Sequence, residues 1–234
     1  MRKILFVTLI VFQGFATAAI AQETFGFEAG VYGGAADWRD RSFQVGLPQA
    51  SPPIPLSLGY KNKPIYGGRL NLLSYGHWAG ELSYSYQGNT VSLRRTSFTP
   101  VELKGGIHEF FYNTVFYPYR YQTTRVIPFA TAGIGMAAYQ LSDEARQRAA
   151  DPKVYGLGNL KSFDRRFAFN YGGGIKFNVL THLGLRFDFR HNFSDVPSYG
   201  LPKESPNPAQ TVLPIQGKLQ NFEGSVGIYF PFLK

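Results

Sequence analysis

Apolar and polar residues alternate with a period of two along most of this chain. The alternation is sharpest in residues 183–193. There the odd positions from 183 to 189 are Leu, Leu, Phe and Phe, whereas the even positions from 184 to 192 are Gly, Arg, Asp, Arg and Asn. Successive side chains of a β-strand point to opposite faces, so this period predicts a strand with one apolar and one polar face.

The same alternation recurs in eight segments. They are residues 25–32, 66–72, 78–87, 106–117, 127–139, 167–179, 183–193 and 219–234. Two are less regular: 106–117 has aromatic residues on both faces, and 127–139 consists mostly of small residues. In the first of these we expect Glu109 and Asn113 to face inward. Segments of about ten residues are long enough for a tilted strand to cross a bilayer.

The connections between these segments alternate in length. Residues 37–64, 88–105, 141–166 and 194–218 are long, whereas 76–77, 118–125 and 181–182 are short. Bacterial outer-membrane barrels have short periplasmic turns, long outer loops and both termini on the periplasmic side. The pattern therefore predicts an all-β fold, an eight-stranded antiparallel up-and-down transmembrane β-barrel.

The polar faces carry charges that a membrane barrel would enclose. The nine residues are Glu28, Arg69, Glu81, Glu109, Lys176, Arg186, Asp188, Arg190 and Glu223. In a barrel they would form a lumen charge network in which bases pair with acids, because a buried charge without a partner is costly. A soluble sandwich or a lipocalin-like barrel would instead leave these faces wetted. Aromatic residues near the strand ends, among them Trp78, Tyr117 and Phe230, favour the membrane barrel, whose interfaces carry aromatic girdles.

The N-terminal residues predict an export signal, and the amino-acid composition excludes cysteine-dependent structure and catalysis. The 234 residues include 26 Gly and no Cys, and the net charge is +9. Without Cys there is no disulfide framework and no thiol nucleophile. A basic start, an apolar run and Ala19-Ile20-Ala21 predict a signal peptide over residues 1–21, followed by a barrel domain over 22–234. The uncharged stretch 126–142 contains a proline and two glycines and is too short for a spanning helix.

The signal peptide, the eight segments and the aromatic C-terminal strand, residues 224–232, together resemble the small bacterial outer-membrane β-barrel proteins of the OmpA membrane-domain and OmpX type. Members of that family commonly end on Phe, whereas this chain ends Phe232-Leu233-Lys234. The resemblance implies the architecture and a location in the outer membrane of a Gram-negative bacterium. It implies little about activity, since one fold hosts many functions.

Motifs that suggest enzyme chemistry have simpler explanations. Gly133-x-Gly135-x-x-Ala138 lies in a strand, without the βαβ context that a dinucleotide site needs. The four histidines lack zinc-site spacing, so we expect no metal and no cofactor. Some eight-stranded barrels modify lipid A with a histidine and a serine near the outer rim. His191 and Ser194 have opposite parity, so we expect them on opposite faces and the protein not to be an enzyme.

The long connections hold 15 basic and 9 acidic residues. This excess predicts contact with outer-membrane lipid and the phosphates of lipopolysaccharide, and it leaves room for surface partners bound through the loops; the alternative is simply solvated loops. A nucleic-acid partner is not expected for an exported barrel. An eight-stranded interior is just wide enough for its own side chains. We therefore expect a non-enzymatic barrel with a packed charged lumen and a structural or surface-interaction role. A narrow pore or transporter, or less favourably a lipid A-modifying enzyme, is the alternative.

Overall fold

A computed structural model describes residues 26–39, 41–45, 54–73, 76–95, 101–119, 125–151, 160–200 and 218–233. The expected signal peptide lies outside these residues. Ten strands and one helix occur in this part of the chain. They are β1 (Gly26–Trp38), β2 (Arg41–Val45), β3 (Ile54–Tyr60), β4 (Pro64–Leu73), β5 (Trp78–Arg95), β6 (Val101–Phe116), β7 (Val126–Leu141), α2 (Asp143–Ala150), β8 (Phe163–Leu180), β9 (Leu183–Asp195) and β10 (Lys218–Leu233).

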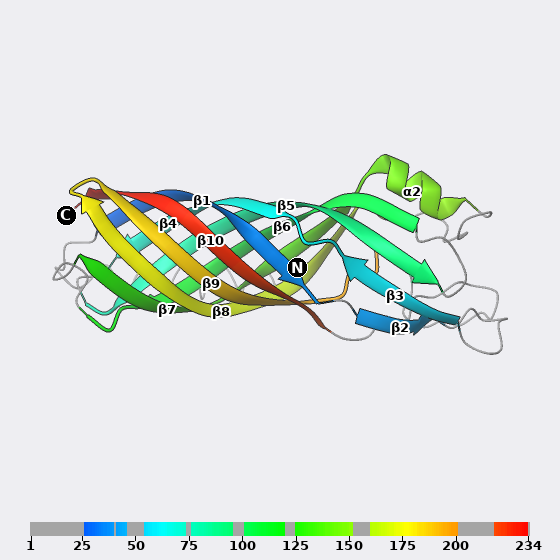
Figure 1. Cartoon of the computed structure of the whole chain (residues 1–234), viewed down its shortest axis with the longest axis horizontal. Helices are drawn as coiled ribbons and strands as arrows, with labels where there is room; N and C mark the ends of the chain where they lie inside the picture. Colours follow the sequence, from blue (N-terminus) through cyan, green and yellow to red (C-terminus); the bar gives the residue numbers. More distant parts are fainter. Residues whose placement is uncertain are drawn as a thin grey trace, which may run out of the picture.

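Eight of the strands close into an antiparallel barrel. The order around the wall is β1, β4, β5, β6, β7, β8, β9 and β10, and β10 pairs with β1 over a register that includes Val31 opposite Ile228. Each neighbouring pair is antiparallel, so the predicted up-and-down topology is confirmed. Figure 1 shows the tilted strands wrapping around a cylinder, with the C-terminus at one end and α2, β2 and β3 at the other.

The two faces of the wall separate as the alternation predicts. Along β9, Leu185, Phe187 and Phe189 are exposed toward the membrane side, and Arg186 and Asp188 are buried inside. Tyr117 is an exception. It was expected in an outer aromatic girdle but is 1% exposed and points into the barrel, because it follows β6 on the same parity as the inward-facing Val115.

The end of the barrel opposite the first residues of β1 and the last residues of β10 contains more regular secondary structure than the predicted long connections. Strands β5 and β6 continue to Arg95 and from Val101, through most of the connection expected at 88–105. The connection expected at 37–64 contains the β2–β3 hairpin, and β3 pairs with the extended part of β5. The connection at 141–166 contains α2, whose N-cap Ser142 accepts a hydrogen bond from the backbone N–H of Ala145. By the usual orientation of such barrels this is the outer end.

The glycines of the sequence motif in β7 are packing positions. A Cβ atom on Gly133 would lie 2.0 Å from Asn113 Oδ1, and one on Gly135 would lie 2.0 Å from the carbonyl oxygen of Phe110. The motif therefore serves the close approach of strands rather than a nucleotide. Within the described residues, no helix is long and apolar enough to cross a membrane.

Candidate functional site: the filled lumen and the outer face

The structure places all nine charged residues of the expected lumen network on the inner face of the barrel. Each is at most 7% exposed, and they come from seven different strands. Strand β9 acts as a scale along the lumen, because its inward residues follow one another from the periplasmic toward the outer end: Arg186, Asp188, Arg190, Asn192 and Ser194. These eight residue steps cover ~27 Å of strand.

Three arginines gather around two carboxylates in the middle of the lumen. Arg186 Nη1 lies 2.6 Å from Glu81 Oε2, and Arg190 Nη2 lies 2.7 Å from Glu81 Oε1. Both arginines also contact Asp188, at 3.0 and 3.1 Å, and Arg69 Nη1 reaches the other oxygen of Asp188 at 2.6 Å. We call these five residues the arginine cluster. Each charge in it is buried but paired, which is the condition under which buried charges are tolerated.

A second ion pair lies nearer the periplasmic end. Lys176 Nζ is 2.6 Å from Glu28 Oε2, and both side chains are fully buried. Asn71 donates a further hydrogen bond to the same carboxylate oxygen. The rings of Tyr117 and Tyr229 lie 5.2 and 5.0 Å from the ammonium group. The aromatic faces thus add a favourable electrostatic environment to the pair.

The remaining two carboxylates differ from the rest. Glu109 and Glu223, which we call the acidic pair, have no ion pair within 4 Å among the described residues. Asn192 Nδ2 donates to both, at 3.3 Å to Glu109 and 3.2 Å to Glu223. Arg190 is the cross-strand neighbour of Glu223, but its Nη2 atom is engaged by Glu81 and Asp188. Four bases therefore do not pair with all five acids.

Apolar layers close the lumen on both sides of these charges. Toward the periplasmic end lies a cluster of Leu73, Ala79, Val115, Tyr117, Ile127 and Phe129, the periplasmic plug. The guanidinium of Arg186 sits 4.3 Å from the Phe129 ring. Toward the outer end, the rings of Trp38, Tyr60 and Tyr139 follow one another at 5.1 and 5.9 Å; these three form the core of the outer plug.

Residues 196–200, the strap, are tied to the outer mouth by one carboxylate. Asp164 Oδ2 accepts hydrogen bonds from the backbone N–H groups of Ser198 and Tyr199, at 2.6 and 2.7 Å. The same oxygen forms an ion pair with Arg166 Nη2 at 2.6 Å. Val196, Pro197 and Tyr199 are buried, and Val196 and Tyr199 belong to the same apolar cluster as the outer plug. The strap therefore extends the outer seal.

The outer face of the barrel wall, which is the face opposite the lumen, carries a cluster of aromatic rings. The cluster lies where β8, β9 and β10 approach the outer end of the barrel. The His191 ring lies 4.0 Å from both Phe193 and Phe222, and Phe169 stacks on Phe193 at 4.5 Å. Two cations border this aromatic cluster: Arg39 is 4.9 Å from the Phe222 ring and Lys218 is 5.4 Å from the Phe169 ring. Rings with adjacent cations are typical of the level at which a membrane meets water.

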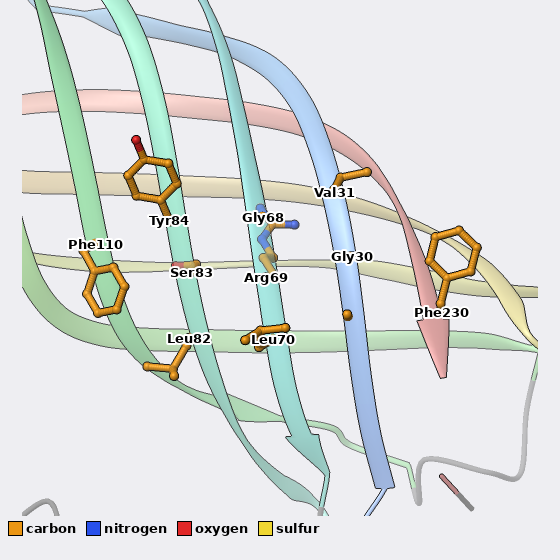
Figure 2. A pocket seen from close by; sticks show the side chains of 11 residues that line it. Gly30, Val31, Gly68, Arg69, Leu70, Leu82, Ser83, Tyr84, Phe110 and Phe230 are labelled. Carbon is orange, nitrogen blue, oxygen red and sulfur yellow. The ribbon is translucent and has the colours of Figure 1, made fainter. Parts of the chain in front are cut away.

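A shallow groove of about 490 Å³ crosses the outer face over β1, β4 and β5. Figure 2 shows Tyr84 and Phe110 on one side of it and Phe230 on the other, with Gly30 and Gly68 between them. The lining is almost wholly apolar. It is a surface suited to hydrocarbon chains.

The structure separates the two residues considered for lipid modification. His191 lies in the outer aromatic cluster, where its Nδ1 atom is 3.1 Å from the Tyr171 hydroxyl. Ser194 is buried inside, with its Oγ atom 2.6 Å from the Tyr139 hydroxyl. They lie on opposite faces, as their parity predicts, so this histidine cannot act as the base for this serine. Among the described residues, no three His, Cys, Asp or Glu side chains are grouped to hold a metal ion.

Asn113 was expected from the sequence to face inward, but none of the amides that connect the lumenal charges was predicted as part of the charge network. Asn71, Asn113 and Asn192 each donate a hydrogen bond to a lumenal carboxylate. Their signal was the same alternation, since each occupies a polar face. The rings of the outer plug had a weaker signal, because Trp38 and Tyr60 fall in a segment that the sequence predicts to be a connection.

Comparison with known proteins supports the same architecture. The family profile described as "Outer membrane protein beta-barrel domain" matches residues 7–230. The crystal structure of the outer membrane protein OprG from Pseudomonas aeruginosa is 11% identical, covers 90% of this chain and 97% of its own, and has a TM-score of 0.59. Neisserial surface protein A (10% identity, 89% and 97% coverage, TM-score 0.47) and AlkL (12%, 92% and 93%, 0.48) are also similar. Comparison with curated protein sequences finds no match.

Proposed function

Because the chain belongs to the outer membrane protein beta-barrel family, we propose that it is a non-enzymatic barrel of the bacterial outer membrane with a structural or surface-interaction role. Residues 1–21 would act as the cleaved export signal. The barrel wall would cross the membrane, and its outer end would meet lipopolysaccharide and other surface partners.

The observation that carries this proposal is the filled lumen. From the periplasmic end outward, the periplasmic plug, the buried ion pairs and the outer plug follow one another. Along β9, every inward-facing residue from 184 to 194 is buried. Conduction would require the arginine cluster to separate, and a buried charge without its partner is strongly unfavourable. This favours a closed barrel over a narrow pore or transporter.

Planar-bilayer recording of the purified, refolded protein tests the closed lumen. We expect no discrete conductance steps at neutral pH, measured on protein whose folded state is verified by the shift between boiled and unboiled samples on a gel. Stable single-channel steps would instead support the narrow pore.

The outer aromatic cluster supports lipopolysaccharide as the membrane partner. Arg39 and Lys218 are exposed and border rings that face the membrane, so an anionic phosphate at the outer leaflet could approach both cations while acyl chains cover the rings. Such contact is electrostatic and should weaken with added salt.

A double variant, Arg39→Ala with Lys218→Ala, tests this contact. We expect it to lose much of the thermal stabilisation that vesicles containing lipopolysaccharide give the wild-type protein over phosphatidylcholine vesicles. The matched control is Arg148→Ala, which removes an exposed cation from α2. Equal stabilisation of both variants by lipopolysaccharide would count against this surface.

A further inference from the structure

The nine charged residues that the structure places in the lumen comprise five acids and four bases, and the excess of acid is localised. Lys176 and Glu28 neutralise each other, and the arginine cluster holds three bases and two acids. The acidic pair adds two carboxylates. If all of these groups are ionised, the arginine cluster carries one positive unit and the acidic pair two negative units, so the net charge of the nine groups is one negative unit.

The acidic pair and its two neighbouring amides include oxygen atoms that have no hydrogen-bond partner among the described residues. Glu223 Oε1 has no partner among the described residues, and neither has Asn192 Oδ1 or Asn221 Oδ1. All three side chains are at most 4% exposed. Asn192 donates to both carboxylates through its amide nitrogen, and Glu109 also accepts hydrogen bonds from Ser85 Oγ, at 3.3 Å, and from the side chain of Asn221, which lies opposite Asn192. Buried oxygens are rarely left without a donor or a cation.

We propose that the acidic pair is an internal binding site for one small hard cation, with sodium as the probe. Its ligands would be carboxylate oxygens of Glu109 and Glu223 and, with their amide groups turned so that oxygen takes the place of nitrogen, the amide oxygens of Asn192 and Asn221. Carboxylate and amide oxygens are the donors that hard cations prefer. One monovalent cation would also balance the enclosed charge.

The site lies between two seals, which gives the cation a structural rather than a transport role. Asn192 is followed on the inner face of β9 by Ser194, which bonds to Tyr139 of the outer plug, and is preceded by Arg190 of the arginine cluster. A cation bound here would hold β6, β9 and β10 together. Among the described residues, no ion pair joins these three strands at the level of Glu109 and Glu223.

The test compares the unfolding temperature of the folded protein in detergent, in sodium chloride and in choline chloride at equal ionic strength. Choline is too large for the site. A ligand that binds only the folded state raises its stability, so we expect a rise of about 5 °C for sodium over choline in the wild-type protein. The double variant Glu109→Gln with Glu223→Gln should fold and lose this difference.

The control is Glu102→Gln with Glu144→Gln, which removes two exposed carboxylates outside the lumen; it should keep the sodium effect. Equal unfolding temperatures in the two salts would overturn the proposal, as would a sodium effect that persists in the Glu109/Glu223 variant. A third outcome would also overturn the proposal: an unfolding temperature that depends on pH but not on sodium, and only while both glutamates are present. That result would mean that a proton, not a metal cation, balances the charge. None of these outcomes bears on whether the barrel conducts.

Discussion

At the scale of single residues, burial of charge dominates the behaviour of this protein. Lys176 and Glu28 are completely enclosed, yet each finds the other at 2.6 Å. The attraction in such a pair offsets the cost of removing both charges from water, whereas either charge alone has no such compensation. The consequence is that loss of one partner should be worse than loss of both.

A double-mutant cycle tests this. We expect Lys176→Met to lower the free energy of unfolding by about 3 to 5 kcal/mol, since the fully buried Glu28 carboxylate loses its ammonium partner. Adding Glu28→Gln should restore much of that loss, because the amide carries no charge. Urea unfolding in lipid vesicles measures both. Simple additivity of the two single substitutions would show that the pair is not coupled.

Arg186 offers a second test at this scale, because it contacts two carboxylates, Glu81 and Asp188. Arg186→Ala should destabilise the barrel by about 3 to 5 kcal/mol and lower the temperature at which its folded band disappears on an unboiled gel. Arg148→Ala, at an exposed position of α2, should change stability by less than about 0.5 kcal/mol. Similar behaviour of the two variants would contradict the assignment of Arg186 to a buried network.

At the scale of elements, the sequence predicts the strands that cross the membrane better than the structure beyond it. Inside the bilayer, every strand has one lipid-facing and one lumenal side, so alternation marks it even where β7 is mostly small residues. Outside the bilayer, β2 and β3 form a short hairpin, and β3 pairs with the last residues of β5. Residues 41–60 show no sharp alternation that would predict this hairpin. The short helix α2 did have a local signal, Ser142 followed by Asp143 and Glu144.

The strap gives a prediction at this scale. Asp164→Asn keeps the size of the side chain but removes its negative charge. The two backbone N–H groups and the guanidinium of Arg166 then face a neutral amide instead of a carboxylate. We expect hydrogen exchange at Ser198 and Tyr199 to accelerate by roughly ten- to a hundredfold, equivalent to about 1 to 3 kcal/mol of local stability.

The control for the strap is Asp195→Asn, at an exposed position on β9. It should leave exchange at the strap unchanged. If Asp164→Asn also leaves exchange unchanged, the strap is held by its buried apolar residues rather than by the carboxylate.

At the scale of the whole molecule, barrel closure decides which lumenal charges meet. Alternation places Arg186 and Glu81 on inner faces, but they are 105 residues apart in sequence and come together only because β9 and β5 lie across the same lumen. Strand tilt and register set the level of each residue along the axis. The sequence therefore indicated the residues of the lumen, while the pairing, and with it the isolation of Glu109 and Glu223, required the three-dimensional arrangement.

The successive seals predict how the closed barrel responds to the loss of one of them. Tyr139 is 1% exposed, its ring lies 5.9 Å from that of Tyr60 and its hydroxyl bonds to Ser194, so Tyr139→Ala should open space in the outer plug while the arginine cluster and the periplasmic plug stay in place. We expect this variant to be less stable by about 3 to 5 kcal/mol yet to remain electrically silent in planar bilayers. Discrete conductance in Tyr139→Ala, but not in the wild-type protein, would mean that the outer plug alone closes the barrel and that the ionic layer beneath it is permeable.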